Sequence, residues 1–264
     1  MQNNEKTIQV YRPSLTHTVI YGTALTITLG VMILLTYAVW GSGLKVKEEG
    51  KSLILIGILV LVVLALFFGF LLFRHRARPV FRIFADGVQL GSEPGIIPFS
   101  EISDVCLFLS GRSIGDSYNN LAFRRNAEDA WHVIAADYTG KTDTFLDSYN
   151  EPRLAYLEQV IEEGGKATFR YMPKKQNMIM SVNANSFLRK LKTAEIELGA
   201  KGMTLDTKYI DYADLQPLYL NGNEFEIRTI RQEVLAGFRY VDMMSFDVFR
   251  ELYNRRTAKS GKGS

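Results

Sequence analysis

The chain has 264 residues, a single cysteine and a formal net charge of +3. A charge this small gives no reason to expect nucleic acid as a partner, and one cysteine, Cys106, cannot form a disulfide within the chain. The three histidines, His17, His75 and His132, lie far apart without metal-ligand spacing, so a zinc site of the usual kinds is not expected.

Two long apolar segments open the chain. Residues 16–40 contain no Asp, Glu, Lys or Arg, and residues 53–73 are also uncharged. Because a helix rises about 1.5 Å per residue, about 20 residues cross a bilayer core of about 30 Å. We predict a polar cytoplasmic tail over residues 1–15, transmembrane helices over residues 16–40 and 53–73, and a short external loop over residues 41–52. A cleaved signal peptide is the alternative for the first segment, but its apolar run is too long and lacks an A-x-A pattern.

Positive residues predict the orientation of the two helices. The segments that flank the helix pair carry six Lys and Arg residues, and the loop between the helices carries three. Because cytoplasmic loops are enriched in these residues, we predict that both termini are cytoplasmic. Four of the six follow the second helix, and we predict that they contact anionic lipid headgroups: Arg74, Arg76, Arg78 and Arg82. The alternative is a ligand pocket that they form with Arg112, Arg124 or Arg125.

Small residues recur at four-residue spacing in both apolar segments. Gly22, Thr26 and Gly30 form one row, and Ala65 and Gly69 form another, with Gly57 eight residues before Ala65. Such rows let helix backbones approach closely, either within one hairpin, which we favour, or between two copies in a homodimer. Except for His17, neither segment contains an ionisable residue, which argues against an ion pathway.

Short β-strands are predicted from residue 80 onward, because apolar residues alternate between turn signals such as Asp86-Gly87. The predicted strands cover residues 80–84, 88–90, 96–99, 105–109, 120–124, 131–136 and 142–146. The period then changes, and apolar residues including Leu157 and Ile161 mark one face of a helix over residues 151–163, with Pro152 in its first turn. These elements make a mostly antiparallel β module over residues 80–165.

The pattern of this module recurs once along the chain. Ala-Asp-Gly-Val-Gln-Leu at residues 85–90 matches Ala-Lys-Gly-Met-Thr-Leu at residues 200–205, and Ile-Pro-Phe-Ser-Glu-Ile at residues 97–102 matches Ile-Asp-Tyr-Ala-Asp-Leu at residues 210–215. A predicted helix over residues 245–255, with Ser245 as its N-cap, ends the second copy. We therefore predict a connector and second module over residues 166–256, in which residues 166–192 form a connector or opening strands. Residues 257–264 are predicted to be a disordered tail.

Residues 97–102 also carry a resemblance to a known family. This element is similar to a signature of bacterial pleckstrin-homology-like (PH-like) membrane proteins, the YcxB-like and related families, in which two transmembrane helices precede the domain. Phe99 and Tyr212 stand where that family has Trp, and the second copy lacks the Pro. The resemblance implies a curved β-sheet closed by a C-terminal helix at a bacterial inner membrane. We therefore expect an α+β protein with a two-helix transmembrane hairpin followed by two PH-like modules, each ending in an α-helix.

No motif in the chain predicts catalysis. Residues 111–116 hold two glycines four apart but lack the Lys-Ser/Thr of a phosphate loop. A triad with His132 could be drawn on paper using Ser110, Ser113 or Ser117, but no G-x-S-x-G element is present. The remaining acid candidates adjoin turn signals, where Asp commonly bonds backbone amides: Asp86, Asp137, Asp143 and Asp147. We expect no enzyme activity, cofactor or metal.

Three functional classes follow from these observations. The leading hypothesis is a non-enzymatic scaffold that is anchored in the bacterial inner membrane and binds a protein partner through its tandem modules, with a toxin-immunity protein as one variant. The alternative is a module that senses lipids or small ligands at the inner membrane face. A transporter-associated subunit is the third class, against which the uncharged helices argue.

Overall fold

The computed structural model describes residues 7–41, 48–91, 93–110, 119–173, 179–180 and 184–260. The chain forms two compact units. The helical unit contains Arg12–Val80 and Asp137–Thr139, and the repeat unit contains Met1–Tyr11, Phe81–Ala136 and Gly140–Ser264. The chain is therefore α+β, with two apolar helices near its N-terminus and several antiparallel sheets.

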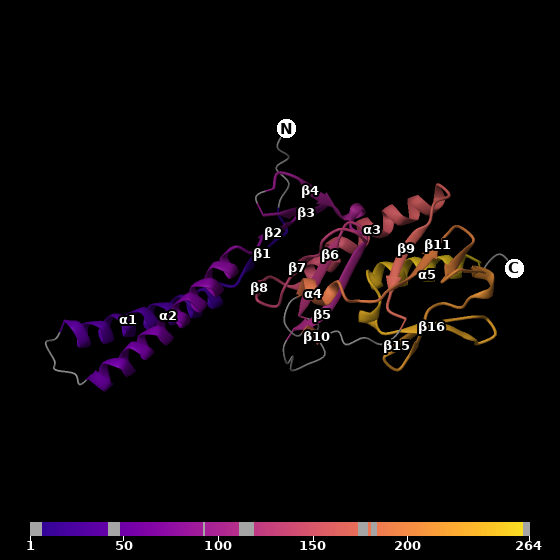
Figure 1. The fold of residues 1–264 in the computed structure, drawn as a ribbon. Helices are drawn as coiled ribbons and strands as arrows, with labels where there is room; N and C mark the ends of the chain where they lie inside the picture. Colours follow the sequence, from indigo (N-terminus) through magenta and orange to yellow (C-terminus); the bar gives the residue numbers. More distant parts are fainter. Residues whose placement is uncertain are drawn as a thin grey trace. The chain divides into compact units, whose positions relative to one another are not determined.

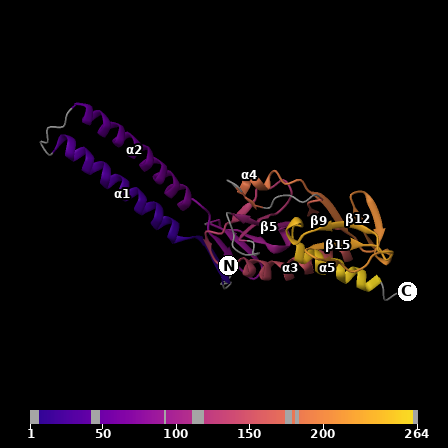
Figure 2. The same cartoon turned by 90° about the horizontal axis from the view of Figure 1, so that it is seen from below.

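The helical unit consists mainly of two helices, α1 (Leu15–Trp40) and α2 (Glu48–Arg76), which lie side by side (Figures 1 and 2). Both are long and apolar enough to cross a membrane. α1 begins after Ser14, whose side chain accepts a hydrogen bond from the Thr16 amide and so caps the helix. α2 starts inside the predicted loop of residues 41–52, of which residues 42–47 lie outside the described residues.

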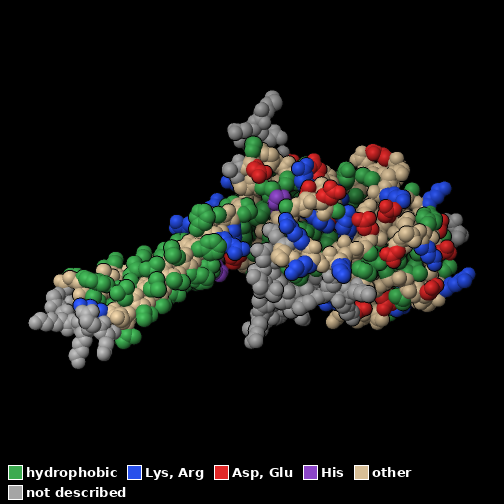
Figure 3. Space-filling model, viewed as in Figure 1, with side chains coloured by type: hydrophobic (Ala, Val, Ile, Leu, Met, Phe, Trp, Pro, Cys, Tyr) green, Lys and Arg blue, Asp and Glu red, His purple; other side chains and the backbone are tan. Residues whose placement is uncertain are grey.

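The apolar surface of the helix pair is bare. None of the most apolar stretch of α2, and only 6% of that of α1, is buried by the chain, and the face seen in Figure 3 is mostly hydrophobic. The predicted packing of small residues within this hairpin is wrong. A Cβ built at Gly22, Gly30, Gly57 or Gly69 meets no atom of the described residues within 4 Å, so these glycines do not face the other helix closely.

The repeat unit contains two repeats with the same order of elements. Each has four antiparallel strands, a 3-10 turn, three further antiparallel strands and a long helix. In the first repeat these are β1 (Gln9–Pro13), β2 (Phe81–Ile83), β3 (Gly87–Leu90), β4 (Ile96–Pro98), η1 (Phe99–Glu101), β5 (Asp104–Ser110), β6 (Asn120–Arg124), β7 (His132–Ile134) and α3 (Thr142–Glu162). In this repeat β8 (Tyr138–Thr139) adds a fifth strand to the first sheet, and β10 (Ile179–Met180) adds a fourth, parallel strand to the second.

The second repeat uses the same plan with one additional 3-10 turn. Its elements are β9 (Ala167–Tyr171), β11 (Ala194–Leu198), β12 (Gly202–Leu205), β13 (Lys208–Asp211), η2 (Tyr212–Asp214), β14 (Tyr219–Asn221), β15 (Glu224–Arg228), β16 (Val234–Phe238), η3 (Tyr240–Asp242) and α5 (Phe246–Ser260). The two helices, α3 and α5, lie side by side (Figure 2). Their contact is supplemented by an ion pair between Arg255 and Glu158 at 3.1 Å.

Both repeats carry an insertion at the same place, between their first and second strands. In the first repeat the insertion is the α1–α2 helix pair, and in the second it is residues 172–193, with β10 (Ile179–Met180) and α4 (Ala184–Leu188). The segment predicted as a polar tail over residues 1–15 contains a strand, Gln9–Pro13, because β1 pairs with β2, which follows the helix pair in the chain. Tyr11 is only 1% exposed, and its hydroxyl donates to the Lys141 carbonyl.

The matched sequence motifs occupy matched positions. β3 and β12 have the same burial pattern, and η1 and η2 place Phe99 and Tyr212 in the core. The Phe99 amide donates to the carbonyl of Asp86 at 2.9 Å, and the Tyr212 amide donates to that of Lys201 at 3.1 Å. The same local hydrogen bond therefore fixes the bend after the fourth strand in each repeat.

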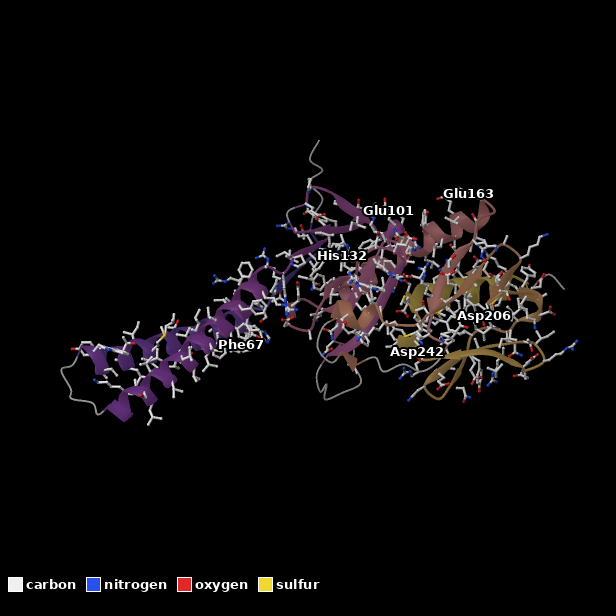
Figure 4. The ribbon with its side chains drawn as sticks, in the orientation of Figure 1. Phe67, Glu101, His132, Glu163, Asp206 and Asp242 are labelled. Carbon is white, nitrogen blue, oxygen red and sulfur yellow. The ribbon has the colours of Figure 1, made fainter. Side chains whose placement is uncertain are left out.

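Helix α3 differs from its prediction. Residues 142–146 were expected to form a strand and residues 151–163 a helix, but one helix covers Thr142–Glu162, with Pro152 in its interior. Its buried side chains fall every four residues, which is helical spacing: Phe145, Tyr149, Arg153, Leu157 and Ile161. This continuous buried face stabilises the helix across a proline that lacks an amide donor. The helix stops before Glu163, labelled in Figure 4, and Gly164 follows with a φ of +89°.

Helix α5 extends further than predicted. It continues to Ser260, so the predicted disordered tail is helical over residues 257–260, and residues 261–264 lie outside the described residues. Thr257 is buried, and its hydroxyl donates to the Tyr253 carbonyl. Ser245 precedes the helix as predicted, but its hydroxyl accepts from the Val105 amide in the first repeat at 3.1 Å. The side chain therefore joins the two repeats.

Candidate functional site: a groove between the two repeats

A buried carboxylate lies where the two repeats meet. The Asp104 side chain on β5 is only 1% exposed. Its Oδ2 accepts from Arg124 Nε on β6 at 2.7 Å, and both its oxygens accept from Arg170 Nη1 on β9 at 3.0 Å. Because a buried charge requires partners, this network holds β9 of the second repeat against β5 and β6 of the first.

Both arginines have further partners that fix their orientation. The guanidinium of Arg124 lies over the Trp131 ring, 4.3 Å from the centroid, and its Nη1 donates to the Ala127 carbonyl. Arg170 Nη2 pairs with Glu195 on β11 at 3.0 Å. The two positive side chains are therefore held in place rather than mobile in solvent.

A groove of about 610 Å³ opens beside this network. Its volume lies in the range that binds small molecules or peptide side chains, roughly 300–1,000 Å³. The apolar lining includes Trp131, Leu188, Leu191 and Met244, and the charged lining consists of three cations and three anions: Arg124, Arg170, Arg189, Glu128, Asp129 and Glu195. The groove thus combines an apolar surface with charges of both signs.

A smaller cavity is lined by Tyr149 and Ser245, among other residues. It measures about 20 Å³, enough for one water molecule. The Tyr149 hydroxyl lies 2.8 Å from Ser245 Oγ, and burial raises the pKa of Tyr149 to about 12. The hydroxyl pair also contacts the backbone of β5 and its approach, at Val105 and Ser103, so its role is to join the repeats.

The four predicted membrane-contact arginines have different local surroundings. Arg74 and Arg76 are exposed in the last turn of α2, whereas Arg78 forms an ion pair with Asp137 within the helical unit. Arg82 belongs to β2 of the repeat unit, where it donates to the Gly91 carbonyl at 2.7 Å. None of the four lines the groove.

Asp137 was predicted to be a turn residue, and it also contacts residues at the ends of both helices. Besides pairing with Arg78, its backbone carbonyl accepts from the Ser14 amide at 2.7 Å, where α1 begins. His75 at the end of α2 is buried and lies 3.7 Å from the same carboxylate. Tyr138, the next residue, donates from its hydroxyl to the Pro79 carbonyl. Residues 137–139 include β8 (Tyr138–Thr139). They therefore contact the start of α1 and the end of α2, which are the two helix ends predicted to face the cytoplasm.

The other residues considered for chemistry are dispersed or lie outside the described part. Residues 111–118, which include the glycine pair, Arg112, Ser113 and Ser117, are not among the described residues. His132 lies on β7, where burial lowers its pKa, and Arg125 pairs with Glu101 at the surface. Burial raises the pKa of the Cys106 thiol to about 12, which makes it unreactive. In the described ranges, no group of three His, Cys, Asp or Glu side chains could hold a metal ion.

The groove was not predicted from the sequence. Arg124 was named there as a possible ligand contact, but no sequence pattern pairs Asp104 with Arg170, which is 66 residues away along the chain. The available signal was the repeat itself, since two copies of one module must meet at some surface. Comparisons of the chain with models of known protein families, with curated proteins and with solved structures find no match.

Proposed function

We propose that the protein is a non-enzymatic binding protein, anchored in the bacterial inner membrane, that holds a protein partner in the groove between its repeats. The order of strands in each repeat, with a closing helix, supports assigning both repeats as PH-like modules. The bare apolar surface of α1 and α2 supports their insertion in a bilayer, because exposing so large a hydrophobic surface to water is unfavourable.

The composition of the groove lining is the observation that carries the proposal. Charges of both signs surround an apolar surface that includes Trp131 and Met244, on a rigid frame fixed by Asp104. A polypeptide segment can offer apolar side chains and both charges at once, whereas a small anion or cation would meet as many like charges as opposite ones. Protein–protein contacts of this kind are centred on apolar anchors with a polar rim.

Photo-crosslinking in cells tests this proposal. A photoreactive amino acid is placed at Glu128, an exposed residue of the groove lining, and at Tyr156 on α3 as a control that is 43% exposed. We expect a discrete crosslinked protein from Glu128 and none from Tyr156. Equal crosslinking at both positions, or none at Glu128, would contradict the proposal. A toxin that acts at the membrane is one class of partner, and neighbouring genes would identify it.

A second candidate function is lipid sensing, which the exposed Arg74 and Arg76 favour. Each basic residue near an anionic surface contributes about 1 kcal/mol of attraction. Arg78 and Arg82 already have partners in the fold, so they contribute less to this contact. Native mass spectrometry of the full chain should then show anionic lipid lost from the Arg74→Gln/Arg76→Gln variant and retained by Arg82→Gln. The two bare helices also support the alternative of a homodimer, with the outward Gly22 and Gly30 at its contact.

A further inference from the structure

The insertion in the second repeat returns to the first repeat. β10 forms a parallel ladder with the edge strand β5, pairing Ile179 with Leu109 and Met180 with Ser110. All other strand pairs in the described residues are antiparallel. A short segment from elsewhere in the chain therefore occupies the edge of this sheet, as a bound peptide does when it adds a strand.

Residues 184–193, which we call the cover, follow β10 and pack on the same sheet. Four apolar side chains of the cover join one buried cluster: Leu188 belongs to it, and three others pack against it. The other members of the cluster are Cys106, Phe108, Ala122, Trp131, Met172, Val241 and Met244. The four side chains of the cover fall at the i, i+3, i+4 and i+7 positions of one helical face: Ala184, Phe187, Leu188 and Leu191. The Phe187 ring lies 5.5 Å from that of Phe108, and Leu188 is buried.

The cover has little regular secondary structure for its length. Only α4 (Ala184–Leu188), five residues long, is helical, and a helix this short is not stable alone. The conformational entropy of ten ordered residues opposes the burial of four apolar side chains, and these contributions are of similar size. Local opening of such a segment therefore requires less free energy than unfolding of the strands beneath it.

The chemistry of the cover indicates what could replace it. Its outward side chains are basic, with Arg189, Lys190 and Lys192 exposed. Glu128 and Asp129, in the turn between β6 and β7, line the groove that Leu188 and Leu191 also line. The surface thus accepts an amphipathic segment with aromatic and aliphatic anchors on one side and positive charge on the other.

We propose that the cover is displaceable, and that the partner protein binds by placing an amphipathic, basic segment of its own on the surface that the cover now occupies. This inference rests on the proposed function, since it assumes a protein partner. It also extends that function: Leu188, Arg189 and Leu191 of the cover form one wall of the groove, and the partner's segment takes the place of this wall. Displacement exposes Cys106, Phe108 and Trp131 to the incoming segment. The intact cover keeps this apolar surface from water until the partner is present.

The single cysteine provides a direct test of displacement. Cys106 is 1% exposed beneath the cover, so its rate of reaction with a thiol reagent reports opening. The Phe187→Ala/Leu188→Ala variant of the full chain in detergent should react at least tenfold faster than the wild-type protein at a temperature where both remain folded. A tenfold change corresponds to about 1.4 kcal/mol in the opening equilibrium.

A matched control separates local opening from general destabilisation. Leu157→Ala removes a buried side chain on α3, outside the cluster beneath the cover, and should lower the melting temperature without a comparable increase in the Cys106 reaction rate. If the cover variant reacts no faster than Leu157→Ala at matched stability, the cover is not a separately opening segment and the proposal fails.

A peptide with the sequence of residues 184–193 then tests what the surface binds. It should protect Cys106 of the cover variant from the thiol reagent, and a peptide carrying alanine at the Phe187 and Leu188 positions should not. Absence of protection would overturn the proposal. Protection in the wild-type protein that increases with its own concentration would assign the surface to a second copy, and would also overturn it. These readouts need no cellular partner, so their failure is distinguishable from a failure of crosslinking at Glu128.

Discussion

At the scale of single residues, Asp104 has the most demanding environment. It is a buried carboxylate that two arginines from different repeats share, at 2.7 Å for Arg124 and 3.0 Å for Arg170. Burying this carboxylate costs desolvation free energy, and its ion pairs offset that cost only while every partner is present. Its value lies in specificity, because only one docking of the two repeats brings both arginines to the same carboxylate.

The substitution Asp104→Asn should therefore destabilise the protein by about 3–5 kcal/mol, because it removes the buried counter-charge that Arg124 and Arg170 share and leaves Arg170 paired only with the exposed Glu195. Denaturant unfolding of the full chain in detergent measures this. The control is Glu101→Gln, which breaks a pair with Arg125 whose side chains are 46% and 52% exposed and should cost only about 0–1 kcal/mol. Similar costs for the two substitutions would mean that Asp104 does not join the repeats.

The raised pKa of Tyr149 predicts how the free energy of unfolding depends on pH. Burial raises its pKa from 10.0 to about 12, so the folded state retains a proton that the unfolded chain loses above pH 10. The stabilisation is fully present below pH 10 and falls by about 1.4 kcal/mol per pH unit as the pH approaches 12. Unfolding free energies measured from pH 9 to 12 should show this decrease.

The variant Tyr149→Phe should have a shallower decrease over the same range. At neutral pH it should lose roughly 0.5–1.5 kcal/mol, because the hydrogen bond with Ser245 is removed. Tyr156→Phe, at an exposed position on α3, is the matched control and should leave the slope unchanged. An unchanged slope in Tyr149→Phe would show that other groups account for alkaline unfolding.

At the scale of elements, the two repeats share a glycine requirement. A Cβ at Gly87 would overlap the Ile97 carbonyl across β3 and β4, and one at Gly202 would overlap the Ile210 carbonyl across β12 and β13. Gly87→Ala and Gly202→Ala should each cost on the order of 2 kcal/mol, because backbone must move to admit the methyl group. Gly95→Ala is the control, since its Cβ meets nothing within 4 Å. Thermal unfolding of the three variants tests this prediction. An unchanged melting temperature in Gly87→Ala or Gly202→Ala would contradict the close approach of the glycine to the carbonyl on the neighbouring strand.

At the scale of the whole molecule, the first repeat is completed by residues that precede the helix pair. Deletion of residues 1–13 removes β1 and with it the buried Tyr11. We expect the first repeat of this variant to be cleaved rapidly in limited proteolysis, because β2 loses one of its two ladder partners and becomes an edge strand. Deletion of residues 261–264 should leave the resistance unchanged. Equal resistance of the two variants would show that β1 is dispensable.

The proposed orientation is also a property of the whole molecule. A reporter enzyme fused after Ser264 should be active in the cytoplasm, and one inserted between α1 and α2 should be active in the periplasm. This follows from the six positive residues that flank the helices against three between them. The reverse activities would place the groove outside the cell and contradict the proposed site of the partner.

Elements whose pattern is local could be predicted from the sequence. Two uncharged stretches predicted α1 and α2, alternation predicted strands such as β6 at Asn120–Arg124, and the repeated motifs located the matched turns at Phe99 and Tyr212. Each depends on side chains within a few residues of one another, so hydrophobic period and turn chemistry suffice.

Contacts between segments far apart in the chain could not be predicted from local patterns and are seen only in the folded protein. The tertiary structure completes the first sheet with β1, extends α3 through Pro152 and brings Asp104 to Arg170. Each of these depends on burial or pairing between residues far apart in the chain, which no local period encodes. The groove and its cover, which carry the proposed function, belong to this second class.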